Sequence, residues 1–408
     1  MNYEEVKNWL CNELPFFQNQ GSNAYKENLD NINLLLKEIE NPQDYFKSIH
    51  IAGTNGKGSV SFMLSKLLKQ EGYKVGLFTS PHLLTFRERI QLDNDYIDKE
   101  SVTNFTNYYK SLNQTINFSF FEFTTAMAFW FFKEKKVDIA IIECGLGGRL
   151  DSTNIINPIL SIISSISLDH SHILGADIMS IAKEKGGIIK KKVPVLISSQ
   201  NKDGVVAYLT KKAAELSSPV FSSKKISNRI KGCKVPSYQI FNIELVKSAK
   251  SILSEIGYKF SGKKYTAMLE GFKEHVPFLG RWTKIQDKPL IICDIAHNIE
   301  SISLVFKQLK NDNRKKHIVL GFSSDKNLNE IFKTINLDGT FYFCSSSNPR
   351  VLSPKKYISL IKSLNKKFFI FKNAQDVLEK ITDEIHEDEI IFVTGSAFIV
   401  ADVLSNFR

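Results

Sequence analysis

The stretch that decides the fold is Ile49-His50-Ile51-Ala52-Gly53-Thr54-Asn55-Gly56-Lys57-Gly58-Ser59. Its first four residues are typical of a buried strand, the glycine-rich part follows directly, and residues 60–70 have the pattern of a helix. In this order the backbone N–H groups and the helix N-terminus attract phosphate oxygens, and Lys57 adds a full positive charge. A strand-to-helix turn without a ligand explains the glycines but not the lysine and serine. We therefore predict that Thr54 to Ser59 bind a nucleoside triphosphate.

The same alternation of apolar runs and helical stretches continues outward from this loop. It predicts two series of crossover-connected parallel strands, over residues 48–216 and 290–394. The fold class is therefore α/β, with a P-loop NTPase-like N-terminal domain (1–279) that has a mainly parallel sheet, and a smaller Rossmann-like α/β C-terminal domain (280–408). Glycines and prolines interrupt the period over 261–289, and we place the boundary near Phe278–Arg281.

Composition excludes several classes of protein. A chain of 408 residues with 43% hydrophobic and 24% charged residues is long enough for two or three domains with real cores. The net charge of +11 is spread over the chain, so it favours anionic ligands without indicating nucleic acid. Five scattered cysteines, no secretory signal, and no apolar stretch of the ~20 residues that a membrane span needs predict a soluble, cytoplasmic protein.

The loop departs from the common phosphate-loop pattern, because Gly58 follows Lys57 and the hydroxyl comes one place later at Ser59. In this it resembles the folate branch of the Mur ligase superfamily, the folylpolyglutamate and dihydrofolate synthases. Further segments are similar to that family in the same order along the chain, from Ile49 to about Asp402: Thr79-Ser80-Pro81-His82-Leu83, Phe121-Glu122, Ile142-Glu143-Cys144-Gly145-Leu146-Gly147-Gly148-Arg149-Leu150-Asp151-Ser152-Thr153-Asn154, Leu168-Asp169-His170, Glu184-Lys185-Gly186-Gly187-Ile188, Asp294-Ile295-Ala296-His297-Asn298 and Thr394-Gly395-Ser396.

The resemblance implies an ATP-dependent acid–amino-acid ligase with two activities. It would add L-glutamate to dihydropteroate and to the γ-carboxylate of folates, each through an acyl phosphate. The implied substrates are ATP, L-glutamate, dihydropteroate and folates, the implied cofactor is Mg²⁺ at two sites, and we expect a monomer without nucleic-acid or membrane partners. Because all these substrates are anions, a positive surface would attract them.

Site residues follow from the resemblance as well. The metal ligands would be Ser80, Glu143 and His170, together with a carbamylated Lys185, and the catalytic group would comprise Lys57, Lys185, His170 and His297. ATP would also contact Asn242, Arg281 and Asp294, and the pterin would contact Phe121, Glu122, Leu150, Asp151 and Ser152. Judged alone, Ser80 is equally a turn hydroxyl, Lys185 a solvated helix residue and His170 a hydrogen-bonded polar histidine, and Lys326 is either a ligand of glutamate or phosphate or a surface lysine.

Four alternative functions predict other sequence features or other substrates. A monofunctional folylpolyglutamate synthase differs only in its failure to use dihydropteroate. A ligase that acts on cell-wall nucleotide precursors is less consistent with two sequence features, Gly58 and the segment 143–154. A nucleic-acid-stimulated ATPase should carry basic residues interleaved with exposed aromatic ones, and a nicotinamide dehydrogenase should carry GxGxxG after a first strand; neither pattern stands out.

Overall fold

The chain folds into two compact units. The computed structural model describes residues 1–21, 28–112, 118–224, 235–274, 278–382 and 384–407. Unit 1 comprises residues 1–167, 171–230 and 239–272, and unit 2 comprises residues 168–170, 231–238 and 273–408. Within the described residues, 168–170 and 235–238 therefore belong to unit 2 although they lie within the sequence range of unit 1.

Unit 1 is built on an eight-stranded sheet with the order β4-β3-β2-β5-β1-β6-β7-β8. Strands β2, β5, β1, β6, β7 and β8 pair in parallel, and β3 and β4 continue the sheet in antiparallel pairing. The strands are β1 (Lys47–Ala52), β2 (Val75–Phe78), β3 (Ile90–Leu92), β4 (Asp95–Tyr96), β5 (Ile139–Glu143), β6 (Leu160–Ile163), β7 (Val195–Ile197) and β8 (Val220–Ser222).

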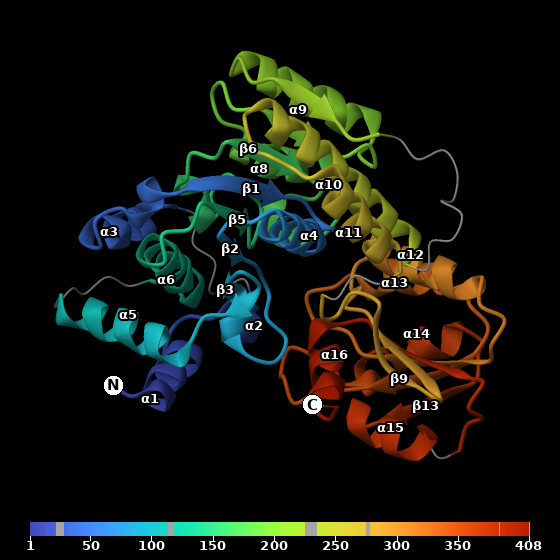
Figure 1. Cartoon of the computed structure of the whole chain (residues 1–408). Helices are drawn as coiled ribbons and strands as arrows, with labels where there is room; N and C mark the ends of the chain where they lie inside the picture. Colours follow the sequence, from blue (N-terminus) through green and yellow to red (C-terminus); the bar gives the residue numbers. More distant parts are fainter. Residues whose placement is uncertain (22–27, 113–117, 225–234, 275–277, 383, 408) are drawn as a thin grey trace. The chain divides into compact units, whose positions relative to one another are not determined.

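Helices cover the sheet of unit 1 and bury its apolar strands (Figure 1). One core joins β2 and β5 to the phenylalanine-rich helix α6, and a second joins β6 and β7 to α8 and α9. The helices are α1 (Tyr3–Asn8), α2 (Phe17–Gln20), α3 (Asp30–Glu38), α4 (Lys57–Gln70), α5 (Lys99–Ser111), α6 (Phe120–Glu134), α7 (Ser171–Leu174), α8 (Ile178–Lys185), α9 (Asp203–Glu215), α10 (Ser237–Glu255, from Gln239 in unit 1) and α11 (Gly262–Glu274), with short helical turns at 9–13, 42–45, 86–89, 152–155 and 186–188.

Unit 2 has a six-stranded sheet of its own, with the order β13-β12-β11-β14-β10-β9. All neighbours pair in parallel except β9, which runs antiparallel to β10. The elements are β9 (Thr283–Asp287), β10 (Leu290–Cys293), α12 (Ile299–Lys310), β11 (Lys316–Leu320), α13 (Leu328–Thr334), β12 (Thr340–Cys344), α14 (Ile358–Ser363), β13 (Phe368–Phe371), α15 (Ala374–Thr382), β14 (Ile390–Thr394) and α16 (Ala397–Leu404), with a helical turn at 354–357.

The predicted α/β class with mainly parallel sheets is confirmed, and the predicted strands of both series are present within a few residues. The region 261–289 differs, because it contains helix α11 and strand β9. Gly262 and Gly271 break the helical pattern in the sequence, yet both are exposed to open space, and apolar packing at Leu269 and Phe272 holds the helix. Tertiary contacts thus override the unfavourable propensity of glycine.

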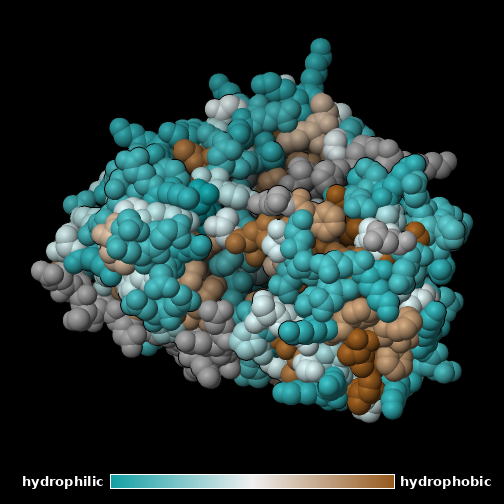
Figure 2. Space-filling model, turned by 90° about the horizontal axis from the view of Figure 1, so that it is seen from below, coloured by the Kyte–Doolittle hydropathy of each residue, from teal (hydrophilic) through white to brown (hydrophobic). Residues whose placement is uncertain are grey.

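The face in Figure 2 is mostly hydrophilic, with hydrophobic residues gathered in small brown groups. Every helix within the described ranges is too short or too polar to span a bilayer.

Candidate functional site

The phosphate loop connects β1 to α4 and requires glycine at two positions. Gly53 and Gly56 have φ of +153° and +91°. A Cβ atom would lie 1.8 Å from the Ser164 hydroxyl oxygen at Gly53, and 2.5 Å from the Asn242 side-chain oxygen at Gly56. The loop is therefore held between β6 and helix α10, and its backbone can take this path only with glycine.

Two lysines from distant parts of the chain meet at this loop. Lys57, the first residue of α4, donates to the carbonyl oxygens of Gly53 at 3.0 Å and Thr54 at 3.3 Å. Lys185, at the end of α8, is 4% exposed and donates to the same Gly53 carbonyl at 2.7 Å. Both lysine side chains therefore lie at the carboxyl end of β1, and Lys57 brings a positive charge to the place where a phosphate would bind.

Helix α10 and the segment after β6 complete the surroundings of the loop. Asn242 donates to Gln239 at 3.0 Å, and Gln239 donates to the hydroxyl of Ser59 at 3.3 Å. The sequence predicted Asn242 and Ser59 but not Gln239, which links them. The hydroxyl of Thr54 exchanges hydrogen bonds with the backbone of Ser167, the carbonyl of Asn55 accepts from Ser164, and Gly58 is buried within α4.

Ser80 and Glu143 lie together in unit 1. The backbone N–H of Ser80 donates to the Glu143 carboxylate at 3.1 Å, and Glu143, at the end of β5, is 2% exposed. His170, the third predicted ligand, belongs to unit 2. Among the described residues, no three His, Cys, Asp or Glu side chains gather into a ready metal centre. A hydroxyl and a carboxylate are nevertheless oxygen donors of the kind that a hard cation prefers.

The predicted pterin residues come from α6 and from the segment after β5. The ring of Phe121 packs so closely on Gly145 that a Cβ there would lie 2.5 Å from it. Glu122 is 2% exposed and accepts from the Ser119 N–H at 2.7 Å and hydroxyl at 2.9 Å, so this carboxylate caps the helix. Leu150 and Ser152 are half-buried and flank Asp151.

Asp151 is almost completely buried, at 4% exposure. Its carboxylate accepts from the backbone N–H of Leu146 at 2.8 Å and of Thr153 at 3.0 Å. Burial raises the pKa of Asp151, and these donors oppose the rise. Such a carboxylate fixes the conformation of the segment in which it lies.

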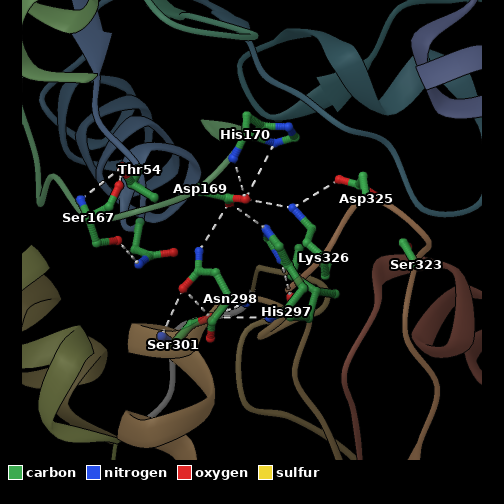
Figure 3. Close-up of polar contacts among 12 residues, drawn as sticks. Thr54, Ser167, Asp169, His170, His297, Asn298, Ser301, Ser323, Asp325 and Lys326 are labelled. Carbon is green, nitrogen blue, oxygen red and sulfur yellow. Dashed lines mark hydrogen bonds and ion pairs between the residues drawn. The ribbon is translucent and has the colours of Figure 1, made fainter. Parts of the chain in front are cut away.

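In unit 2 the central group is Asp169, which accepts from three side chains of two later segments (Figure 3). Lys326 Nζ lies 2.6 Å from Oδ1, while His297 Nε2 and Asn298 Nδ2 lie 3.1 and 3.2 Å from Oδ2. Burial would raise the Asp169 pKa, but the charge of Lys326 and the hydrogen bond with His297 hold it well below its usual range. Lys326 is therefore a buried member of an ionic cluster, with a side chain only 8% exposed.

Other side chains extend this cluster. Asp325 lies 3.3 Å from Lys326 Nζ and accepts from Arg350 at 2.9 Å. His170 has φ of +48°, and burial lowers its pKa to about 3. The sequence predicted His170 and His297 as site residues, whereas Asp169 was noted only as part of a motif. In the folded chain Asp169 lies beside both His170 and His297. The contact with His297 joins residues far apart in the sequence, so no sequence pattern could identify Asp169 as the centre of the cluster.

Asp294 follows β10 and is also buried. Its carboxylate accepts from the phenol of Tyr238 and from the backbone N–H groups of Trp282 and Ala296, both at 2.9 Å. Burial raises the pKa of Asp294 despite these donors. Arg281 donates to the Gly280 carbonyl at 3.2 Å and lies over Phe278. Tyr238 was not predicted, because nothing in the sequence relates it to a residue 56 positions later.

Comparison with known proteins gives one consistent family. Residues 51–267 match the Mur ligase middle domain, and residues 280–397 match the Mur ligase glutamate ligase domain. The chain is 32% identical over 365 residues to the dihydrofolate synthase/folylpolyglutamate synthase of Buchnera aphidicola subsp. Baizongia pistaciae, covering 86% of this chain and 84% of that protein. It is 30% identical to the folylpolyglutamate synthase of Lacticaseibacillus casei, covering 90% and 92%.

Solved structures agree with the sequence relatives. The Mycobacterium tuberculosis folylpolyglutamate synthase complexed with ADP superposes with a TM-score of 0.85 at 26% identity, covering 99% of this chain and 98% of that one. The ADP in that complex is the product expected of a ligase that consumes ATP.

Proposed function

Since this chain belongs to the Mur ligase family and groups with the dihydrofolate synthase/folylpolyglutamate synthases, we propose that it joins L-glutamate to dihydropteroate and to the γ-carboxylate of folates. The chain is an ATP-dependent ligase. The observation that carries this proposal is the phosphate loop, at which Lys57 and Lys185 share the Gly53 carbonyl, in a chain similar to such ligases over most of its length.

The chemistry explains why a phosphate site is needed. A carboxylate is a poor electrophile, so its oxygen first attacks the γ-phosphorus of ATP, and ADP leaves. The amine of glutamate then attacks the acyl carbon, phosphate departs with the bonding electrons, and the amine loses a proton. Lys57 neutralises charge on the transferring phosphoryl group, and Asn242, Arg281, Asp294 and His297 are the further residues that we assign to the nucleotide.

Mg²⁺ fits the donors in unit 1. Ser80 and Glu143 supply a hydroxyl and a buried carboxylate that lie together, and we assign His170 as the third ligand. The ion would supply positive charge to the phosphate oxygens. We propose Mg²⁺ at two sites, the second served by Lys185.

Carbamylation of Lys185 would convert its ammonium into an anionic ligand for that second ion. The buried Nζ beside the Gly53 carbonyl would keep its N–H donor in the carbamate. Incubation with ¹³C-labelled bicarbonate should give a carbamate NMR signal that is absent in Lys185→Ala. An unmodified lysine in the active nucleotide complex would contradict this assignment.

ADP release is the decisive test. With ATP, Mg²⁺ and glutamate, we expect ADP to form only when dihydropteroate or tetrahydrofolate is also present. If neither acceptor supports ADP release by folded protein, the proposal fails. If only tetrahydrofolate is used, the chain is a monofunctional folylpolyglutamate synthase, the alternative that the Lacticaseibacillus casei relative represents.

A further inference from the structure

A row of buried hydrogen bonds connects strand β1 with the segment after β5. His50 Nε2 lies 2.8 Å from Thr153 Oγ1, and Thr153 Oγ1 lies 2.5 Å from the Asp151 Oδ1 atom. His50 and Thr153 are 0% exposed and Asp151 is 4% exposed. His50 and Thr153 are therefore closed to solvent. The Cys144 Sγ atom also lies 3.1 Å from His50 Nε2 and 3.6 Å from Thr153 Oγ1, and Asp151 is the carboxylate that the row reaches.

The chemistry of the three side chains determines which atom donates and which accepts in each hydrogen bond of this row. The Thr153 hydroxyl has one proton, and the carboxylate can only accept, so Thr153 donates to Asp151 and accepts from His50 Nε2–H. Burial lowers the pKa of His50 to about 3, so the ring is neutral and has a single N–H. His50 Nδ1 finds no hydrogen-bond partner within the described part of the chain. A proton on Nδ1 would leave a buried donor unsatisfied, which favours the Nε2–H tautomer.

Asp151 also holds the conformation of the segment in which it lies, through a further hydrogen bond. Its second oxygen accepts from Leu146 N–H at 2.8 Å, which ties the start of the segment to its middle. Asn154 donates to the carbonyl of Arg149 at 3.0 Å and closes the other end. The segment is thus held at Leu146, Asp151 and Asn154, and Phe121 packs on it at Gly145.

We propose that His50 and Thr153 are positioning residues for the acceptor substrate, because their hydrogen bonds hold Asp151 and with it the segment Leu150–Ser152 in the conformation that receives the pterin. This inference rests on the proposed function, which assigns the pterin to these residues. A purely structural role would instead lower stability without selecting one substrate.

The first test compares Thr153→Val, which keeps the shape but removes the hydroxyl, with Thr153→Ser, which keeps the hydroxyl. We expect Thr153→Val to raise the KM for dihydropteroate about tenfold while the KM for ATP stays unchanged, and Thr153→Ser to restore most of the loss. Thr106→Val is a matched control, because Thr106 is also fully buried and donates to the Val102 carbonyl at 2.9 Å. All variants are assayed below their unfolding temperatures.

The second test replaces His50, and it decides the question even if Thr153→Val does not fold. His50→Gln retains a donor near the Nε2 position and should keep a near-normal dihydropteroate KM, whereas His50→Phe should raise it. In the unmodified protein, ¹⁵N NMR of labelled histidine should show a neutral His50 ring with its proton on Nε2. An Nδ1–H tautomer would overturn the inference.

The outcomes separate this inference from the proposed function. If the natural chain releases no ADP with any acceptor, the proposed function fails. If the natural chain is active but Thr153→Val and His50→Phe leave the dihydropteroate KM unchanged, or raise the KM for ATP equally, only the positioning role fails.

Discussion

The phosphate loop of unit 1 and the Asp169 cluster of unit 2 hold their charged groups in different ways. In unit 1, Lys57 and Lys185 donate to backbone carbonyls, and the loop path depends on Gly53 and Gly56. In unit 2, Asp169 is held by the side chains of His297, Asn298 and Lys326. In the phosphate loop the lysines donate to uncharged carbonyl oxygens, whereas in the Asp169 cluster cationic and anionic side chains neutralise much of each other's charge.

The largest expected effect concerns the positive charge at the phosphate loop. Lys57→Ala should lower kcat/KM by at least about 10²-fold, because a cation at the phosphoryl group is lost. Lys66→Ala, on the same helix α4 with its Nζ over Phe62, serves as the control and should keep normal activity. Steady-state ADP release checks both variants, and a fully active Lys57→Ala would refute the phosphate-site assignment.

The next effect tests the compensated cluster. Among the described residues, Asp169→Asn leaves Asp325 as the counter-ion of Lys326, whose side chain is 8% exposed. We expect the free energy of unfolding to fall by about 2–3 kcal/mol, less than for an isolated buried pair because Asp325 remains. Urea unfolding followed by circular dichroism measures the change. Asp338→Asn is the control, because that carboxylate is 97% exposed beside Lys366, and its replacement should have no measurable effect.

A pH experiment distinguishes a neutral buried group from a charged one. The His50 pKa is lowered from 6.5 to about 3 by burial, so protonation favours the unfolded state and stability falls as pH drops below 6.5. Between about pH 7.5 and about pH 5 the natural chain should lose roughly 2 kcal/mol relative to His50→Gln. Urea unfolding of both proteins at each pH measures this difference, and parallel pH profiles would contradict it.

The smallest effect concerns an exposed ion pair in unit 1. Arg149 lies 2.9 Å from Glu184, and its side chain is 55% exposed. Arg149→Ala should therefore change the free energy of unfolding by less than about 1 kcal/mol. An effect as large as that of Asp169→Asn would contradict the expected difference between buried and exposed charges.

Structural features formed by residues close together in the sequence could be predicted, whereas contacts between distant residues could not. The strand, loop and helix around Lys57 are contiguous, so the local pattern was sufficient for their prediction. Helix α11 was missed because Gly262 and Gly271 break its pattern, and its stability comes from Leu269 and Phe272. The assigned roles of the site residues and the domain boundary at 279/280 stay predictions.

The sequence by itself determined the α/β class, the phosphate loop and the family, because each depends on local periodicity or on short contiguous motifs. Only the tertiary structure decided that Lys185 shares a carbonyl with Lys57, that Lys326 is buried against Asp169, and that His50 reaches Asp151 through Thr153. The physical reason is that hydrogen bonds and ion pairs depend on distance and direction in space. Residues 100 or more positions apart acquire these only when the sheets bring them together.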